Sequence, residues 1–303
     1  MRGIEWTKKY IQRKDIAFIV AATLGVLGLN LLGWSMVDSK VLSVSLSVSV
    51  GLILFVQIAI YRKQRELHER KQRELHEKLR VELRQNYKQV EAMLSMMQFF
   101  KLKRPLPPMR NWSISPDLGN IIISTILDTK PRIVVECGSG ISTLLTACLL
   151  KELGQGKIYS LEHDQEYADI TRKNLEAHEI LDKAEVIYAP LKEISLQGNT
   201  WLWYQNSFIE KITSIDLLII DGPPGHLQKM ARYPAIPMLY SLLSDNATII
   251  LDDAKREDER EIVKVWLAEY KNLECEYRDT EKGTAILRKV HSPEDLDSKN
   301  SGS

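Results

Sequence analysis

Residues 134–145 read VVECGSGISTLL. The apolar run Arg132–Cys137 predicts a buried strand, and the apolar spacing over 141–153 predicts a helix. Between them, Gly138 and Gly140 let the backbone turn tightly and approach a ligand closely. The helix that follows offers N–H groups without intrahelical partners. This stretch therefore predicts a strand, a glycine turn and a helix, although the turn alone also fits an ordinary strand–helix connection.

Alternating strands and helices continue to residue 289. This alternation predicts an α/β domain with a parallel sheet covered on both faces. A closing antiparallel hairpin is expected around Lys282 and Gly283, and Pro234 and Pro237 must break the helix expected before the fifth strand. The expected strands are 157–161, 184–188, 215–221, 247–251, 273–278 and 284–289, and the expected helices start at Ser115 and cover 165–178, 226–243 and 255–270.

Acidic residues follow the ends of these strands, where ligands bind in such sheets. Glu162 comes directly after the second strand and is placed to accept hydrogen bonds from both hydroxyls of a ribose. Together with the glycine turn, it predicts a nucleoside site. NAD is the rival cofactor, but Thr143 stands where the dinucleotide fingerprint has its third glycine.

As a set, four segments resemble the class I S-adenosylmethionine-dependent methyltransferases: VVECGSGISTLL, SLEHD, DLLIIDGPPG and IILDDAKRE. The resemblance covers roughly 105–290 and implies a Rossmann-like sheet of seven strands with a terminal antiparallel hairpin. It implies that the methionine part of S-adenosylmethionine lies at the glycine turn, the ribose at Glu162 and the adenine near Pro190. The implied cofactor-binding residues are Glu136, Gly138, Ser139, Gly140, Ser142, Thr143, Glu162, His163, Pro190 and Asp221.

Three carboxylates, Asp221, Asp252 and Asp253, follow two strands that we expect to be neighbours. Such a group suits a hard divalent ion such as Mg2+, and the positions resemble the metal ligands of catechol-type O-methyltransferases. The chain departs from that pattern in having Asp253 in place of Asn and Pro224 in place of a lysine. Alternatively, Asp253 caps the next helix, and Asp221 holds the cofactor or the acceptor without a metal.

Candidates for the remaining chemistry lie close to these acids. Removing the proton of a hydroxyl acceptor requires a general base or a metal, and His226 is the candidate base together with Asp221, with Lys229 as a further candidate. We expect an acceptor pocket walled by Trp201, Trp203 and Tyr204, unless these aromatics form an apolar cluster. Arg232 and Tyr233 are candidates for contacting an acidic acceptor.

The N-terminal part predicts a membrane anchor over residues 1–61. Residues 16–37 and 41–61 contain no charged side chain, and each is long enough to cross a bilayer as a helix. Lys and Arg precede the first segment and follow the second, while only Lys40 lies between them. The positive-inside rule then predicts a helical hairpin in the cell membrane with both termini in the cytoplasm.

Residues 62–103 predict a long basic helical stalk, which begins with two copies of RKQRELHE. Its basic character beside the anchor favours anionic lipid head groups. An apolar stripe over 79–98 indicates self-association or packing against the domain, unless the helix is simply solvated. The stripe consists of Leu79, Leu83, Tyr87, Val90, Leu94 and Met97. We place the catalytic domain at 104–290 and a disordered tail at 291–303.

The charge distribution excludes one class of partner. The chain has a net charge of +1, yet residues 111–303 carry 21 Lys and Arg against 31 Asp and Glu. An acidic main domain argues against nucleic-acid binding. The sequence thus predicts a membrane-anchored methyltransferase that methylates oxygen on a membrane-associated acceptor (a lipid-linked sugar, a lipid head group or a protein) with help from Mg2+. The alternative is a non-catalytic membrane-tethered scaffold with the same fold.

Overall fold

The computed structural model describes residues 25, 28, 39–100, 102–109, 113–205 and 212–290. Two compact units, Met1–Val81 and Glu82–Ser303, divide the chain. The second unit begins within the predicted stalk, earlier than the expected domain start at 104, because the last turns of the stalk helix pack on the domain. Most of the first predicted span, 16–37, and the predicted tail, 291–303, lie outside the described residues.

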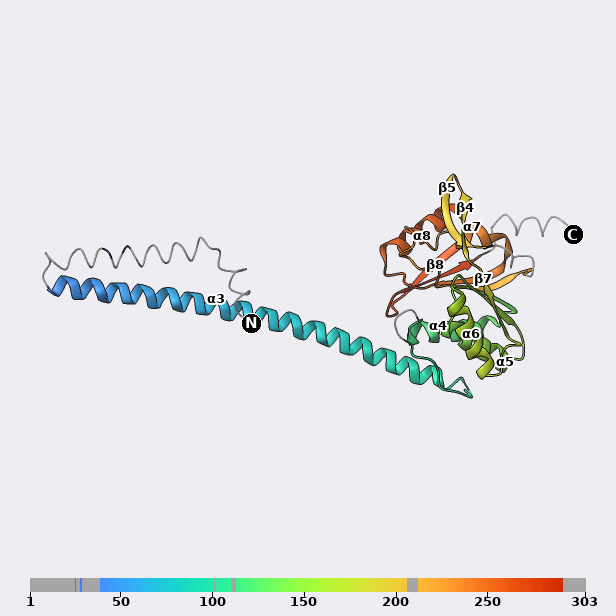
Figure 1. Cartoon of the computed structure of the whole chain (residues 1–303), viewed down its shortest axis with the longest axis horizontal. Coiled ribbons are helices and arrows are strands. Elements are labelled where there is room, and N and C mark those ends of the chain that lie inside the picture. The colour runs from blue at the N-terminus through green and yellow to red at the C-terminus, as the bar shows by residue number, and fades with distance from the viewer. Residues whose placement is uncertain are drawn as a thin grey trace. The chain divides into compact units, whose positions relative to one another are not determined.

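A single sheet of seven strands organises the second unit, in the order β3-β2-β1-β6-β7-β9-β8 (Figure 1). Neighbouring strands run parallel except at the edge, where β9 is antiparallel to both β7 and β8. The predicted Rossmann-like sheet with its terminal antiparallel hairpin is therefore confirmed. Its strands are β1 (Ile133–Cys137), β2 (Lys157–Glu162), β3 (Ala184–Tyr188), β6 (Ile215–Ile220), β7 (Leu243–Leu251), β8 (Leu273–Arg278) and β9 (Thr284–Lys289).

Helices cover both faces of the sheet, as the alternating pattern predicts. Successive residues of a strand point to opposite faces, so Val134 joins a core with α4, α5 and α6, whereas Val135 joins a core with α7 and α8. Both valines are fully buried. The helices are α4 (Pro116–Thr129), α5 (Ile141–Glu152), α6 (Gln165–Ala177), α7 (Ala235–Leu239) and α8 (Glu257–Glu269), with a 3-10 turn η2 (Tyr240–Leu242).

Two segments differ from the expectation. The connection after β3 contains a second, two-stranded sheet, β4 (Leu191–Leu196) and β5 (Asn199–Tyr204), joined by a tight turn at Gln197 and Gly198. The helix predicted over 226–243 with breaks at Pro234 and Pro237 is correct only in part: turns and bends occupy 226–234, α7 and η2 are helical, and Pro237 lies within α7. Pro234 lies at the N-cap of α7, and the proline ring prevents a helix from continuing through it.

The order of the strands sets the place of the site. From β1 the chain moves outward to β2 and β3, and then returns to β6 on the other side of β1. The carboxyl ends of β1 and β6 therefore form the switch point at which a doubly wound sheet opens a crevice. Backbone N–H groups of Asp221 and Gly222 both donate to the Cys137 carbonyl, at 3.0 and 2.7 Å, and hold the two strand ends together.

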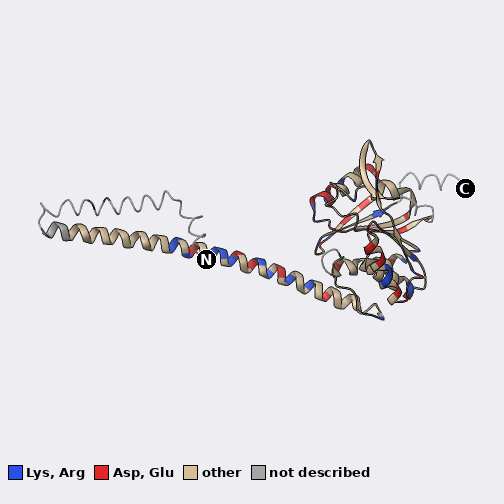
Figure 2. Cartoon of the chain, in the orientation of Figure 1, with Lys and Arg blue, Asp and Glu red and all other residues tan. Residues whose placement is uncertain are grey.

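Helix α3 (Ser39–Met97) begins in the first unit. Its N-terminal part is long and apolar enough to cross a membrane. The most apolar 18-residue stretch has a mean hydropathy of 2.2, and none of it is buried. Figure 2 shows this stretch without charged residues, followed by mixed Lys, Arg, Asp and Glu. Strand-like alternation of serines does not prevent the helix, and the Ser49 hydroxyl donates to the Ser45 carbonyl one turn back at 2.8 Å.

The end of α3 packs on the second unit through a face other than the predicted stripe. Met96 is fully buried, Asn120 donates to the Ala92 carbonyl at 3.1 Å, and Gln89 donates to Asp117 at 2.8 Å. All six residues of the apolar stripe are exposed, by between 41 and 66%. The interpretation of the stripe as a domain-packing face is therefore wrong. The contact with the domain is made instead by a different face of α3, which carries Gln89, Ala92 and Met96 at spacings of three and four residues.

Candidate functional site

A cavity of about 270 Å³ opens at the carboxyl ends of β1, β2 and β6. This volume lies near the lower end of the range for small-molecule sites. We call it the strand-end cavity; it is lined by Gly138, Ser139, Ser142, Glu162, His163, Asp164, Tyr167, Tyr204, Asp221, Gly222, Pro224 and His226. It thus combines the glycine turn, the predicted ribose acid, Asp221 and the candidate base in one space.

Two positions beside the cavity, one in the glycine turn and one after β6, require glycine. Gly138 has φ of 98°, in the left-handed region that side chains rarely adopt. Gly222 has no room for a side chain, because a Cβ there would overlap the Tyr204 hydroxyl. The backbone of both segments can therefore approach a ligand without obstruction. The Tyr204 hydroxyl is buried and has no hydrogen-bond partner among the described residues, so it is available on the cavity side.

Glu162 sits at the end of β2 with its carboxylate surrounded by donors. The Ser139 N–H and hydroxyl donate to one oxygen at 3.0 and 3.1 Å, and the Asp164 N–H and His163 Nδ1 contact the other at 3.1 and 2.9 Å. Burial alone would raise the pKa of Glu162, but the hydrogen bonds from His163, Asp164 and Ser139 outweigh it and hold that pKa below its usual value. The group is therefore an anionic acceptor at neutral pH.

Glu136 lies below the turn and does not line the cavity. It is fully buried, and one of its oxygens accepts from the hydroxyls of Thr143 and Ser160 at 2.5 and 2.6 Å. Thr143 in turn accepts from the Gly140 N–H at 3.0 Å. The threonine at the third-glycine position thus ties the turn to the strand below it. Burial raises the pKa of Glu136 to about 7.

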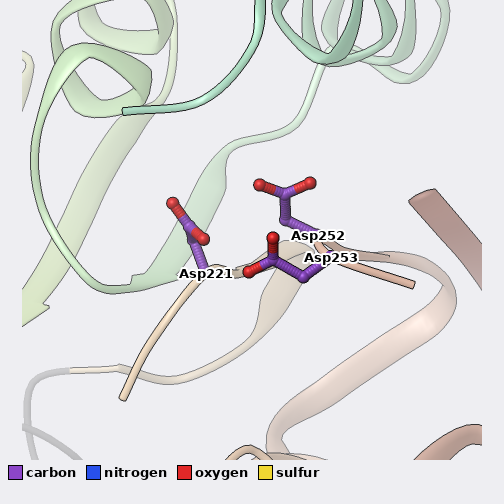
Figure 3. A group of neighbouring side chains, drawn as sticks. All are labelled: Asp221, Asp252 and Asp253. Atoms are coloured by element: carbon purple, nitrogen blue, oxygen red, sulfur yellow. The ribbon is translucent and has the colours of Figure 1, made fainter. Parts of the chain in front are cut away.

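The three predicted metal ligands are brought together. Ligand oxygens of Asp221, Asp252 and Asp253 all lie within 4.8 Å of one another, at the ends of β6 and β7. Figure 3 shows these side chains, which we call the acid cluster. Burial raises the pKa of Asp221 to about 6, against the opposing charge of Arg232. Burial and the neighbouring carboxylates raise the pKa of Asp252 to about 8.

Arg232 already lies among these carboxylates. Its Nη2 donates to Asp253 Oδ2 at 2.7 Å, to the Asp221 carbonyl at 2.6 Å and to Asp221 Oδ1 at 3.2 Å. Its Nη1 donates to the Asp252 carbonyl at 2.9 Å. Only 3% of the side chain is exposed. Burial alone would lower the pKa of Arg232, but the carboxylates of Asp221 and Asp253 raise it, so the guanidinium stays charged.

The position of Arg232 among the carboxylates decides how well the acid cluster suits Mg2+. Carboxylate oxygens are the right ligands for such an ion, which requires them at about 2.0–2.1 Å in near-octahedral geometry. In this chain, however, one oxygen of Asp221 and one of Asp253 already accept from the same guanidinium. Of the three carboxylates, only that of Asp252 keeps both oxygens without a hydrogen-bond partner among the described residues, and one carboxylate alone does not make an octahedral site. The residues present therefore do not fit the predicted Mg2+. The expectation that Arg232 contacts an acidic acceptor is also wrong, because its guanidinium is buried against these carboxylates.

The comparison with protein families agrees with this geometry. Residues 135–254 match the family model described as "Methyltransferase domain". This part of the chain is a methyltransferase domain. A search of the curated proteins finds no match.

Solved structures similar to the chain include an O-methyltransferase from Bacillus cereus in complex with SAH, at 17% identity and a TM-score of 0.45. That match covers 59% of this chain and 84% of the other. A second is the SAH-bound methyltransferase PaMTH1 from Podospora anserina, at 17% identity and a TM-score of 0.48, covering 67% of this chain and 88% of the other. A third is the O-methyltransferase TomG from Streptomyces achromogenes, at 11% identity and a TM-score of 0.45, covering 67% and 89%.

Not every predicted residue of the methyltransferase domain reaches the cavity. Gly138, Ser139, Ser142, Glu162, His163, Asp221 and His226 line it, whereas Glu136, Gly140 and Thr143 support the turn and Pro190 lies outside the lining. Of the expected aromatic wall, Tyr204 lines the cavity, while Trp203 and Trp201 belong to the apolar core, the first fully and the second in part. The apolar-cluster interpretation is therefore correct for the two tryptophans.

Sequence reasoning missed Tyr167 and the role of Arg232. Tyr167 lines the cavity from the first turn of α6, and the available signal was Asp164, whose side chain caps that helix by accepting from the Glu166 and Tyr167 N–H groups. Arg232 gave no such signal, because it lies eleven positions after Asp221 in a stretch of turns whose path is not periodic.

Proposed function

We propose that the chain transfers a methyl group from S-adenosylmethionine to an oxygen of a membrane-associated acceptor, without a divalent metal. The observation that carries the proposal is the strand-end cavity at the switch point of a methyltransferase domain, with the Glu162 carboxylate on its wall. S-adenosylmethionine supplies an activated methyl group on its sulfonium sulfur, so the protein's task is mainly positioning.

The cofactor side of the cavity is formed by β1 and β2. Two of the four donors on Glu162, the Ser139 hydroxyl and the His163 ring, belong to side chains that can rotate. We infer that ribose hydroxyls replace them when the cofactor binds, while the backbone donors stay. The methionine part then lies against Gly138 and Ser142, and the open backbone at Gly138 permits its close approach.

The acceptor side is formed by Asp221 and His226. For a hydroxyl acceptor, the new bond joins its oxygen to the methyl carbon, the carbon–sulfur bond breaks, and the hydroxyl proton must leave. Both side chains line the cavity. Arg232 already donates to the Asp221 carboxylate, which suits that group to orienting a hydroxyl rather than to taking its proton. We assign His226 as the base that takes the proton, and Asp221 as the group that orients the acceptor hydroxyl.

The acceptor class follows from the apolar start of α3 and the basic segment after it. A helix that crosses the bilayer, followed by repeated Lys and Arg, holds the methyltransferase domain beside anionic head groups. We propose the two-span anchor over 16–37 and 41–61, with both termini in the cytoplasm, and an acceptor that is itself in the membrane. A lipid-linked sugar or a lipid head group fits this arrangement best.

A radiolabel experiment tests the proposal. Membrane vesicles carrying the full chain are supplied with S-adenosylmethionine labelled on the methyl group, beside vesicles carrying Glu162→Ala. The expected result is label in the organic extract or in membrane protein, dependent on Glu162. Label in water-soluble products only, at the same rate after the spans are exchanged for a soluble tag, would overturn the membrane acceptor.

The exposed stripe on α3 supports one further partner. Leu83, Tyr87, Val90 and Leu94 are each more than half exposed and recur every three or four residues. We propose that a second copy of the chain covers them in a homo-oligomer. Crosslinking in vesicles should give a dimer that Leu83→Gln with Leu94→Gln abolishes, whereas an unchanged dimer would contradict this role.

A further inference from the structure

The acid cluster is an unusual site, because its cation is part of the chain. We propose that the guanidinium of Arg232 is the resident cation of the acid cluster, so that this site takes no divalent metal ion and Arg232 positions Asp221 at the strand-end cavity. The inference deepens the metal-free part of the proposed function: metal binding at the cluster would overturn both, whereas methyl transfer and the role of Glu162 would stand.

The first argument is geometric. A divalent ion held by Asp221 and Asp253 must lie close to one oxygen of each. Arg232 Nη2 occupies that place, at 3.2 Å from Asp221 Oδ1 and 2.7 Å from Asp253 Oδ2. The same nitrogen donates to the Asp221 carbonyl, so Arg232 binds the backbone at the end of β6 as well as the Asp221 side chain. A planar fork of this kind matches two carboxylates at once and cannot lose its charge.

The second argument is burial. The side chains of Arg232 and Asp253 are only 3% and 5% exposed, so the pair is closed to water. A buried charge is stable only when it is paired and hydrogen-bonded. For a metal ion to enter, this guanidinium would have to leave the cluster, and it would have to find other acceptors within the packed interior.

The third argument is the local charge balance. Besides Arg232, the cluster is reached by Arg256, whose Nη1 lies 2.9 Å from Asp253, and by Lys282, whose Nζ lies 3.9 Å from Asp252. Glu259 adds one more acid, 3.9 Å from Arg232. Three basic side chains thus face four acidic ones, which leaves much less negative charge than three isolated carboxylates would offer a metal.

The arrangement also explains how Asp221 reaches the cavity. Arg232 holds the backbone carbonyl and the carboxylate of Asp221 together with the backbone of Asp252. These bonds link the ends of two neighbouring strands, and Asp221 is the member of the acid cluster that lines the cavity. Arg232 therefore acts through Asp221 and is a positioning residue.

Mn2+ titration of the full chain in detergent micelles tests this, with free Mn2+ read by its paramagnetic resonance signal. Binding is assigned to the acid cluster only when Asp253→Asn removes it. The expected result is no such binding in the wild type and at least a tenfold gain in affinity in Arg232→Ala. Arg232→Lys, which keeps the charge, and Arg256→Ala, which leaves the buried guanidinium in place, should both stay closed to Mn2+.

Two results would overturn the proposal. The first is wild-type binding of one Mn2+ that Asp253→Asn abolishes. The second is a folded Arg232→Ala variant that gains no Mn2+ binding. If Arg232→Ala does not fold, the wild-type arm decides alone: specific Mn2+ binding contradicts the proposal, and its absence, together with the closed Arg232→Lys variant, supports it.

Discussion

Two groups of carboxylates lie at the same edge of the sheet and are satisfied in opposite ways. Glu162, after β2, is held by backbone N–H groups and two rotatable side chains, and it faces the strand-end cavity. In the acid cluster, after β6 and β7, a buried guanidinium binds the carboxylates of Asp221 and Asp253. Donors that can exchange leave a carboxylate ready for a ligand, whereas a buried cation makes a carboxylate part of the framework.

The comparison explains why residue type and position alone do not identify a site. Both groups consist of acids that directly follow parallel strands, which is the usual place for ligand contacts. Only their partners differ.

Removing the charge of Asp253 should have the largest effect. Asp253→Asn keeps the shape and tolerates the φ of 60° at this position, but it leaves the buried Arg232 without its nearest anion. We expect a loss of about 3 kcal/mol in the free energy of unfolding, measured by denaturant titration with tryptophan fluorescence. The exposed Asp245→Asn is the control, and an equal, small effect of both changes would contradict the role of the pair.

Removing the Glu162 carboxylate should weaken the binding of S-adenosylmethionine. Glu162→Ala removes the acceptor proposed for the ribose hydroxyls, and we expect a roughly 30-fold loss of affinity for S-adenosylmethionine, or about 2 kcal/mol. Glu176→Ala, on the exposed side of α6, is the matched control. Calorimetry measures both, and full affinity in a folded Glu162→Ala variant would place the cofactor elsewhere.

Glu136 provides a carboxylate that contacts no cation among the described residues and does not line the cavity. Because its pKa is raised from 4.5 to about 7, the folded state binds more protons than the unfolded state between these values. Stability contributed by this group therefore falls as pH rises through that window, by at most about 1.4 kcal/mol per pH unit. Glu136→Gln should lack this part of the slope. Unfolding free energies at pH 5 and pH 7 give the comparison, and parallel wild-type and variant profiles would exclude the assignment.

Arg256 should matter least. It contacts Asp253 at 2.9 Å, as Arg232 does at 2.7 Å, but 53% of its side chain is exposed. Surface ion pairs contribute less than about 1 kcal/mol and are weakened by salt. Arg256→Gln should therefore shift the unfolding free energy only slightly, and the shift should shrink further in high salt. A loss as large as that of Asp253→Asn would mean that exposure does not distinguish the two arginines.

Local patterns in the sequence predict most of the fold and half of the site. Strand limits such as 184–188 and 284–289 agree with the structure because apolar runs bounded by turn residues fix them locally. The hairpin β4–β5 was missed because its two strands, on a small separate sheet, show no regular alternation of buried and exposed residues: half of β4 is exposed, whereas β5 runs from exposed residues to the buried Trp203 and Tyr204. The stripe on α3 left self-association, domain packing and a solvated helix open, since periodicity identifies an apolar face but not its partner.

The functional site, like the fold, contains residues that local sequence patterns predict and residues that they do not. Glu162 and the glycine turn were predictable because adjacent strands and their following turns bring them together. Arg232 was not, because its guanidinium reaches the acid cluster from a turn segment, and only the tertiary structure places it between Asp221 and Asp253.

The most direct test is calorimetric titration of S-adenosylmethionine into the full wild-type chain in detergent micelles, with EDTA present and then with Mg2+ in excess. The account predicts one site per chain, with micromolar affinity in EDTA and the same affinity in Mg2+. No binding at millimolar ligand by folded protein, or binding that appears only with Mg2+, would contradict it.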